Sequence, residues 1–256
     1  MLNVTSFKAT TPQDRPPLLI AHGLFGSGRN WGVIARRLAD QRDVLTVDMR
    51  NHGESPRAAS QAYPDMAQDL AEVIMAHGGI ADVLGHSMGG KTAMVLALTS
   101  GQMVRRLVVA DIAPVAYTHD QSGNVASMAD LDLNSITNRA EADAQLAKTI
   151  NDPALRAFFL QSLDLRATPP VWRLNLDVLG QQVENVVGWP GTTGQYDGRS
   201  LFLSGANSLY VLPEHRALIL AQFPMASFAR IPGAGHWLHA EKPRAFEETV
   251  RIFLNF

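Results

Sequence analysis

Residues 81–90 read Ala-Asp-Val-Leu-Gly-His-Ser-Met-Gly-Gly, and this stretch decides the fold. Its first four residues are a short apolar run typical of a strand, and apolar residues recur at helical spacing over residues 91–98. Between them, residues 85–89 match the pattern G-x-S-x-G. In that pattern the serine occupies a sharp strand-to-helix turn, which projects its hydroxyl above the sheet. Ser87 is therefore the candidate nucleophile.

The alternative is a glycine-rich turn that holds a serine by chance. The position between an apolar strand and a helix favours the catalytic interpretation, because the helix N-terminus favours a developing negative charge. A dinucleotide site is excluded, since Gly85, Gly89 and Gly90 do not form G-x-G-x-x-G.

Strands and helices alternate on both sides of this turn, which predicts a mostly parallel sheet flanked by helices. Apolar runs predict strands at residues 18–21, 44–47, 81–84, 106–110, 201–203 and 227–231. Helical spacing predicts helices at residues 31–39, 66–76, 91–98, 214–222 and 243–253.

The alternation stops between residues 114 and 196. Helices are expected near residues 139–150, 153–163 and 178–187, and no strand is expected. We therefore predict a core made of residues 1–113 and 197–256, with residues 114–196 inserted as a helical cap, or lid, over the active site. A purely structural extension is the alternative.

Composition narrows the class of protein. The 256 residues are 46% hydrophobic and 18% charged, with a formal net charge of −2. This balance argues against nucleic acid as a partner, and the absence of cysteine removes disulfides and thiolate catalysis. Neither a signal peptide nor an apolar stretch of roughly 18 residues is visible. The expected location is the cytoplasm, and no metal motif is present.

The candidate general base is His236, one of eight histidines. It follows the strand predicted at residues 227–231, where a hydrolase of this type places its histidine. Gly233 and Gly235 allow the loop to bend back toward Ser87. His239 is expected to be structural or supporting, and His86 is expected to point away from the serine's side of the strand.

The usual place for the third residue holds no acid. The loop after residues 201–203 has no Asp or Glu before Glu214. Asn207 or Ser208 could orient an imidazole, but neither carries the charge that stabilises an imidazolium.

Asp111 is the best carboxylate by elimination. It ends the strand at residues 106–110, at the same sheet edge as Ser87, and it keeps the chain order serine, acid, histidine. Asp48 ends a strand but precedes the serine, and Asp197 precedes its strand and so lies at the wrong edge. A strand-end aspartate that merely caps the next turn is the alternative.

Backbone N–H groups complete the predicted site. Met88, after the nucleophile, supplies one oxyanion donor, and the loop after residues 18–21 supplies the other. Leu24 is the first choice for that second donor and Phe25 the next. Phe25 and Trp237 are predicted to line the substrate pocket. The charged loop at residues 48–55 is interpreted as structural.

Several segments together resemble a known family. HGLFGS at residues 22–27, VDMRNHGESPR at 47–57, GHSMGGKTAM at 85–94, DIAPVAY at 111–117 and GAGHWLHAEKP at 233–243 are similar to those of YbfF-type esterases, small bacterial proteins of the α/β-hydrolase superfamily. The resemblance covers both flanks of the core and is thinner in the insertion, where Arg173 and its neighbours still look similar.

The resemblance implies an α/β-hydrolase fold with a helical cap and a serine esterase or acyl-CoA thioesterase activity. It places the acid after the earlier strand, in agreement with Asp111, and so implies the triad Ser87, Asp111 and His236. No cofactor is implied; the partner is a small acyl ester or thioester. Rival activities on the same triad are C–C bond hydrolysis and cofactor-free haloperoxidase or perhydrolase chemistry, and a non-catalytic binding relative is a further alternative. Arg173 is expected to meet solvent or an anionic substrate group.

Overall fold

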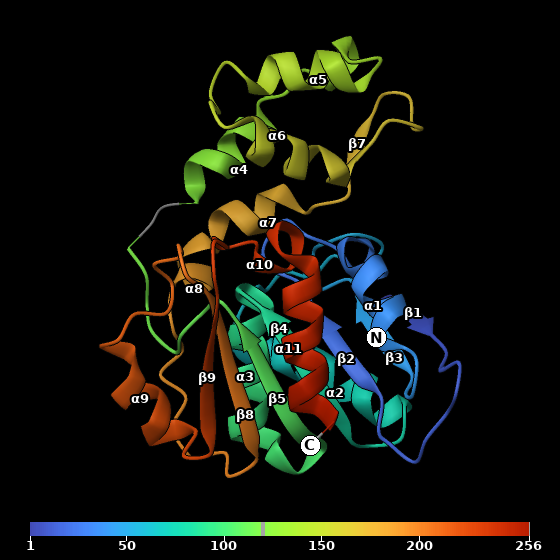
Figure 1. The fold of residues 1–256 in the computed structure, drawn as a ribbon. Helices are drawn as coiled ribbons and strands as arrows, with labels where there is room; N and C mark the ends of the chain where they lie inside the picture. The colour runs from blue at the N-terminus through green and yellow to red at the C-terminus, as the bar shows by residue number, and fades with distance from the viewer. Residues whose placement is uncertain (119–120, 256) are drawn as a thin grey trace.

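A seven-stranded sheet forms the centre of the protein in a computed structural model that describes residues 1–118 and 121–255 (Figure 1). The spatial order of the strands is β1-β3-β2-β4-β5-β8-β9. In chain order these strands are Val4–Phe7, Leu18–Ala21, Val44–Val47, Ala81–His86, Val104–Ala110, Arg199–Gly205 and Ala226–Ile231. The pair β1–β3 is antiparallel, and all other neighbouring pairs are parallel.

The six predicted strands and their parallel arrangement are confirmed. Every residue of β2, β3 and β4 is buried, which is typical of parallel strands covered on both faces. The carboxyl ends of the parallel strands, and the residues that follow them, therefore lie at one edge of the sheet.

Strand β1 was not predicted. It lies at the sheet edge with two exposed residues, and its sequence Val-Thr-Ser-Phe has neither an apolar run nor an alternation that marks a strand. Pairing with β3 creates this strand, and the local sequence alone does not.

Helices cover both faces of the sheet, and the predicted ones are confirmed with shifted ends. Helices α1 (Gly32–Leu38) and α11 (Pro243–Asn255) pack on one face, whereas α2 (Tyr63–Ala76), α3 (Met88–Ser100) and α9 (His215–Gln222) pack on the other. Helix α11 buries Phe246, Val250, Phe253 and Leu254, at the spacing of an amphipathic helix.

The chain between β5 and β8 stands above the carboxyl edge of the sheet (Figure 1). It contains α4 (Ser122–Ala129), α5 (Arg139–Leu146), α6 (Pro153–Phe159), α7 (Leu176–Gln181) and α8 (Val183–Val187). Most of its buried apolar side chains form one cluster together with Phe25, around Met128, Phe159 and Trp172. We call residues 114–196 the cap; its boundaries remain a prediction.

The prediction that the cap holds no strand is wrong. Strands β6 (Leu163–Asp164) and β7 (Val171–Trp172) pair antiparallel. Two residues are too few to show a sequence period, so this pair leaves no readable signal. Helix α4 was also not predicted, since its sequence Ser-Gly-Asn-Val-Ala-Ser-Met-Ala contains few strong helix formers.

Candidate active site

Ser87 lies in a strained turn between β4 and α3. Its backbone has φ 52° and ψ −117°, a conformation that non-glycine residues rarely adopt. The two glycines of the motif permit this turn. A Cβ atom on Gly85 would lie 2.2 Å from the carbonyl oxygen of Gly89, and one on Gly89 would lie 2.3 Å from that of Ala21. The motif therefore encodes close backbone approach, as expected for a nucleophile turn.

Asp111 directly follows β5 and is completely buried. Its Oδ2 atom accepts a hydrogen bond from His236 Nδ1 at 2.7 Å, and its Oδ1 atom accepts one from the Gly205 N–H at 3.0 Å. The hydroxyl of Ser208 donates to Oδ2 as well. These three donors compensate for the loss of hydration of a buried carboxylate. The structure thus brings Asp111 and His236 together, while Ser208 contacts the acid and not the imidazole.

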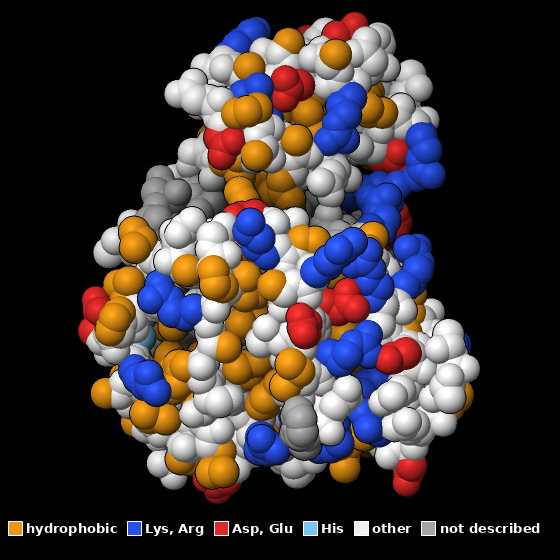
Figure 2. Space-filling model, viewed as in Figure 1, with side chains coloured by type: hydrophobic (Ala, Val, Ile, Leu, Met, Phe, Trp, Pro, Cys, Tyr) orange, Lys and Arg blue, Asp and Glu red, His pale blue; other side chains and the backbone are white. Residues whose placement is uncertain are grey.

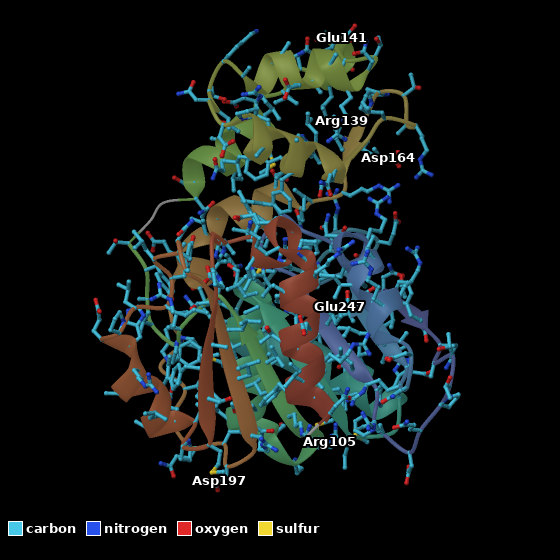
Figure 3. All side chains as sticks on the ribbon, in the orientation of Figure 1. Arg105, Arg139, Glu141, Asp164, Asp197 and Glu247 are labelled. Atoms are coloured by element: carbon cyan, nitrogen blue, oxygen red, sulfur yellow. The ribbon has the colours of Figure 1, made fainter. Side chains whose placement is uncertain are left out.

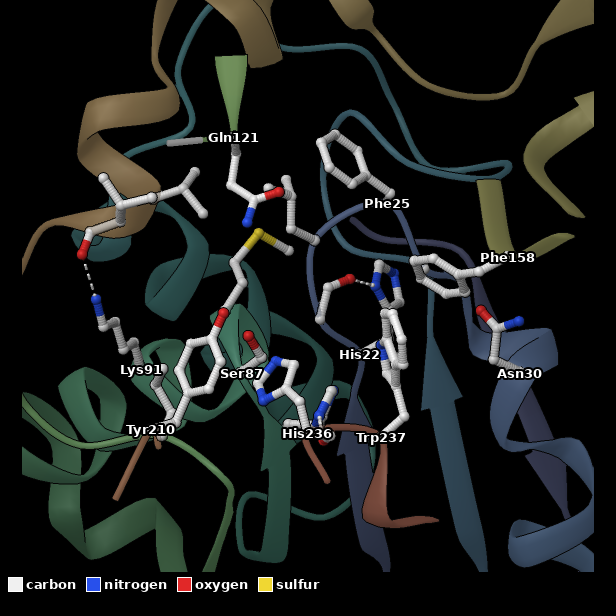
Figure 4. A pocket seen from close by; sticks show the side chains of 18 of the residues that line it. His22, Phe25, Asn30, Ser87, Lys91, Gln121, Phe158, Tyr210, His236 and Trp237 are labelled. Atoms are coloured by element: carbon white, nitrogen blue, oxygen red, sulfur yellow. Dashed lines mark hydrogen bonds between the residues drawn. The ribbon is translucent and has the colours of Figure 1, made fainter. Parts of the chain in front are cut away.

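His236 faces Ser87 at the base of a cavity. Figure 4 shows the Ser87 hydroxyl and the Tyr210 ring next to the imidazole ring of His236. The rings of Tyr210 and His236 stack with centroids 3.9 Å apart and planes 19° apart. Sequence reasoning missed Tyr210, which lies 26 residues before the histidine and belongs to no motif. It limits the rotation of the imidazole.

His86 supports the same loop from beneath. Its Nε2 atom lies 2.9 Å from the carbonyl oxygen of His236, to which it donates when that nitrogen is protonated. Burial holds the pKa of His86 well below its usual value, and burial lowers the pKa of His239 to about 3. Both imidazoles are therefore neutral at pH 7. His239 stacks on Trp31 with centroids 4.2 Å apart, in agreement with the structural role predicted for it.

The two residues predicted to supply the oxyanion donors, Leu24 and Met88, both line the cavity above Ser87. Met88 is the first residue of α3, and the first N–H groups of a helix have no partner within it. Leu24 borders the cavity, and its N–H forms no hydrogen bond with any residue in the described part of the chain. The Phe25 N–H donates to His52 Nε2 at 3.1 Å. The geometry therefore favours Leu24 over Phe25 as the second oxyanion donor.

Neutral histidines hold the loop that carries Leu24. The Nε2 atom of His22 accepts a hydrogen bond from the Met49 N–H at 2.9 Å, as His52 does from Phe25. An acceptor nitrogen must be unprotonated. Burial, together with the nearby His22, lowers the pKa of His52 to about 3, which keeps it in that form.

Asp48 ties the neighbouring loops together. It accepts hydrogen bonds from the Gly28 N–H at 2.7 Å, from the Glu54 N–H at 2.9 Å and from the side chain of Asn3 at 2.9 Å. The structural interpretation of residues 48–55 is confirmed by these contacts.

The two environments expected for Arg173 are both wrong. Its guanidinium forms ion pairs with Glu54 of the core and with Asp164 of the cap, and only 13% of its side chain is exposed. Two carboxylates thus occupy it, so it joins the cap to the core.

The other carboxylate that was set aside lies far from this site. Figure 3 labels Asp197 at the end of the molecule opposite the cap. Asp197 precedes β8 and therefore lies at the amino edge of the strands, as predicted.

The cavity above Ser87 has a volume of about 290 Å³, close to the lower limit of roughly 300 Å³ for small-molecule sites. Figure 2 shows a hollow between cap and core with hydrophobic side chains on its floor. One group of lining residues is aromatic or aliphatic and includes both predicted pocket residues: Phe25, Leu155, Phe158, Phe159 and Trp237. A second group is polar and was not predicted as part of the site: Tyr63, Lys91, Tyr117, Gln121 and Asn124.

Residues 1–118 and 121–255 contain neither a membrane-spanning helix nor a cluster of metal ligands. None of the helices there has the length and apolarity needed to cross a bilayer. The same residues contain no group of three potential metal ligands from His, Asp and Glu. The cytoplasmic location stays a prediction.

The sequence of this chain is similar to those of known proteins. The family model described as alpha/beta hydrolase fold matches residues 16–243. Esterase YbfF of Escherichia coli is 39% identical over 258 residues, which cover 99% of each chain. The chain belongs to the YbfF-type esterases of the α/β-hydrolase family.

Other relatives agree with this membership. The mouse protein named sn-1-specific diacylglycerol lipase ABHD11 is 40% identical over 248 residues, which cover 93% of this chain and 81% of that protein. A solved structure of a marine microorganism esterase superposes with a TM-score of 0.92 at 35% identity and covers 98% of both chains. The family assignment and the fold predicted from the sequence are thus confirmed.

Proposed function

We propose that this hydrolase cleaves carboxylic esters and acyl-CoA thioesters through an acyl-enzyme on Ser87, with His236 as general base and Asp111 as orienting acid. The observation that carries the proposal is the 2.7 Å contact between His236 Nδ1 and Asp111 Oδ2, beside a serine held at positive φ. In the proposed mechanism, a histidine whose Nδ1–H is bound by a carboxylate presents an unprotonated Nε2 to the serine, and His236 and Ser87 line the same cavity.

The reaction proceeds in two halves. In the first, the Ser87 oxygen attacks the acyl carbonyl while His236 takes the hydroxyl proton, and the N–H groups of Leu24 and Met88 bind the oxyanion. Collapse of the tetrahedral intermediate breaks the bond to the alcohol or thiol, which leaves with the proton from His236. In the second half, His236 takes a proton from water, the hydroxide attacks the acyl group, and the acid departs as Ser87 regains its proton.

The cap serves as the lid of this site. Residues of α6 and α8, such as Phe158 and Val187, line the cavity together with Ser87 of the core. The cap therefore shields the acyl group from bulk water on the side away from the sheet.

Steady-state kinetics with p-nitrophenyl esters and acyl-CoAs of graded length test the proposal. Wild-type protein is expected to turn over members of both series, and Ser87→Ala is expected to abolish turnover while circular dichroism and melting temperature stay unchanged. Retained activity in Ser87→Ala contradicts the assignment. Activity on C–C bonds or in halide oxidation, with none on esters, selects one of the rival reactions, and inactivity with all of these substrates favours a binding relative.

A further inference from the structure

Lys91 is a buried cation that the proposed reaction does not use. It follows Ser87 by four residues and so lies one turn further along the same face of α3. Its side chain is 1% exposed, and it borders the same cavity as Ser87. Figure 4 places it to one side of Ser87, away from Trp237 and Asn30.

The described groups that the Lys91 ammonium contacts are neutral. Its Nζ atom donates to the carbonyl oxygens of Val187, at 2.8 Å, and of Gly188. It lies 4.8 Å from the ring centre of Tyr117 and 5.6 Å from that of Tyr63, within the range of cation–π attraction. Among residues 1–118 and 121–255, no carboxylate forms an ion pair with it.

Burial of an ammonium group without a counter-ion is unfavourable, because carbonyls and rings replace only part of its hydration. Burial accordingly lowers the pKa of Lys91 to about 7. Two of its three N–H donors are used by carbonyl oxygens, which leaves one for a ligand. An anionic ligand in the cavity would supply both the missing acceptor and the missing charge.

A second donor borders the same cavity. The side-chain oxygen of Gln121 accepts from Asn124 Nδ2 at 2.9 Å, so the Gln121 amide nitrogen keeps its N–H groups for another partner. One ammonium N–H and one amide N–H suit the two oxygens of a carboxylate. A phosphate dianion would bring a second charge, and the described residues that line this cavity include no further lysine or arginine to compensate it.

We propose that Lys91 is a specificity-determining residue that binds a carboxylate at the far end of the acyl group, so that this enzyme prefers monoesters of dicarboxylic acids. The inference rests on the proposed function, since it assumes attack by Ser87 on the ester at the other end. The aromatic group of Phe25, Phe158 and Trp237 then receives the leaving group, or the acyl chain when the substrate is neutral.

A competing explanation is that Lys91 only fastens α8 to the core. The hydroxyl of Tyr63 donates to the carbonyl oxygen of Val186, the residue before the Lys91 acceptors. Tyr63→Phe removes one such bond to α8 and leaves the charge in place. It is therefore a matched control for Lys91→Met, which removes both the bonds and the charge.

The test compares kcat/KM for monoethyl esters of malonate, succinate, glutarate and adipate with that for ethyl valerate, whose acyl chain is neutral. Wild-type protein is expected to prefer at least one monoester over ethyl valerate. Lys91→Met is expected to lower that ratio roughly 10- to 100-fold, the range for loss of a hydrogen bond to a charged group. Lys91→Arg is expected to keep part of the preference, and Tyr63→Phe is expected to keep the wild-type ratio.

The pH dependence of the same ratio gives a second readout, because any effect of pH that is common to both substrates cancels in the ratio. Lys91 faces Tyr63 from α2, Tyr117 from the segment after β5 and the carbonyls of α8. Burial raises the pKa of both Tyr117 and Tyr63, so neither ring ionises near neutrality. The preference for the monoester should therefore decrease from pH 7 to pH 9 as Lys91 loses its proton.

The outcomes separate the two proposals. Equal ratios in wild type and Lys91→Met, or a ratio that Tyr63→Phe lowers as much, would mean that Lys91 only anchors α8. Wild-type turnover of p-nitrophenyl butyrate with no preference for any monoester overturns the Lys91 inference alone. Failure of every ester, neutral or anionic, overturns the proposed function together with it.

Discussion

Asp48 and Asp111 occupy equivalent places in the sheet and differ in what surrounds them. Each directly follows a parallel strand, β3 or β5, and each is buried, with 5% and 0% of its surface exposed. Asp48 accepts only from groups that stay neutral: two backbone N–H groups and the amide of Asn3. Asp111 accepts from one backbone N–H, one hydroxyl and the ring of His236.

In the proposed mechanism, this difference separates a structural carboxylate, Asp48, from a catalytic one, Asp111. Position at the strand end puts both groups at the functional edge, but only the loop after β9 brings a histidine to one of them. Asp48 holds neighbouring loops in place through donors that stay neutral throughout the proposed reaction. The charge of Asp111 faces a ring that gains a proton during the proposed reaction, so it stabilises that state more than the resting one.

The largest expected effect is that of Asp111→Asn on activity. An amide in this place favours the wrong tautomer of His236 and cannot stabilise its protonated form, so kcat should fall about 10⁴-fold. Asparagine tolerates positive φ, and Asp111 has φ 54°, so the fold should persist. Steady-state kinetics with p-nitrophenyl butyrate and a thermal melt measure both quantities; a loss below tenfold would argue for another acid.

Asp48→Asn should have the opposite effect: it should lower stability and change kcat little. The single carbonyl oxygen of an amide cannot serve the three donors that the carboxylate accepts, and each buried donor left unpaired costs about 1–3 kcal/mol. The free energy of unfolding in urea should fall by about that amount, while kcat of the folded protein falls less than about tenfold, far short of the factor expected at Asp111. A drop in kcat as large as that of Asp111→Asn would contradict the distinction between a structural Asp48 and a catalytic Asp111.

The histidines near Asp48 predict a pH dependence of stability. The folded-state pKa of His52 is about 3, below its ordinary value of 6.5. Between these values the unfolded chain binds a proton that the folded chain does not, so stability is complete above pH 6.5 and decreases as pH falls toward 3. From pH 7 to pH 5 this single residue accounts for about 2 kcal/mol.

His52→Gln provides the matched variant for that prediction. Its side-chain oxygen can still accept from Phe25, but it binds no proton. Urea unfolding at pH 7 and pH 5 should show a smaller pH difference in the variant, since it lacks both the titration of His52 and the repulsion between His52 and His22. Identical pH differences would show that His52 does not carry this sensitivity.

The smallest expected effect is that of Ser208→Ala. The variant removes one of three donors to Asp111 and leaves the bond to His236 in place. The carboxylate then loses one hydrogen bond, and kcat should fall about 3- to 10-fold, as expected for a net change near 1 kcal/mol. An effect equal to that of Asp111→Asn would mean that Ser208, and not the carboxylate charge, orients the histidine.

The fold and the candidate catalytic side chains could be predicted from the sequence because both depend on local patterns. The apolar run before Gly85 and the two motif glycines predict the turn that holds Ser87, and the order of strands places Asp111 and His236 at the same edge. Tyr210, Ser208 and Lys91 could not be predicted in the same way. Their positions depend on how distant loops fold over the sheet, and no periodicity or motif records such contacts. Lys91 had one signal, its four-residue spacing from Ser87.

The most direct test of the central claim is the rate at which a fluorophosphonate labels Ser87, followed by intact mass and peptide mapping. Wild-type protein should acquire one label on the peptide that contains Ser87. Asp111→Asn should slow labelling by at least about 100-fold, since the probe needs the same activated serine, and Asp48→Asn should label at nearly the wild-type rate. A label on any other residue, or equal slowing by the two aspartate variants, would contradict the account.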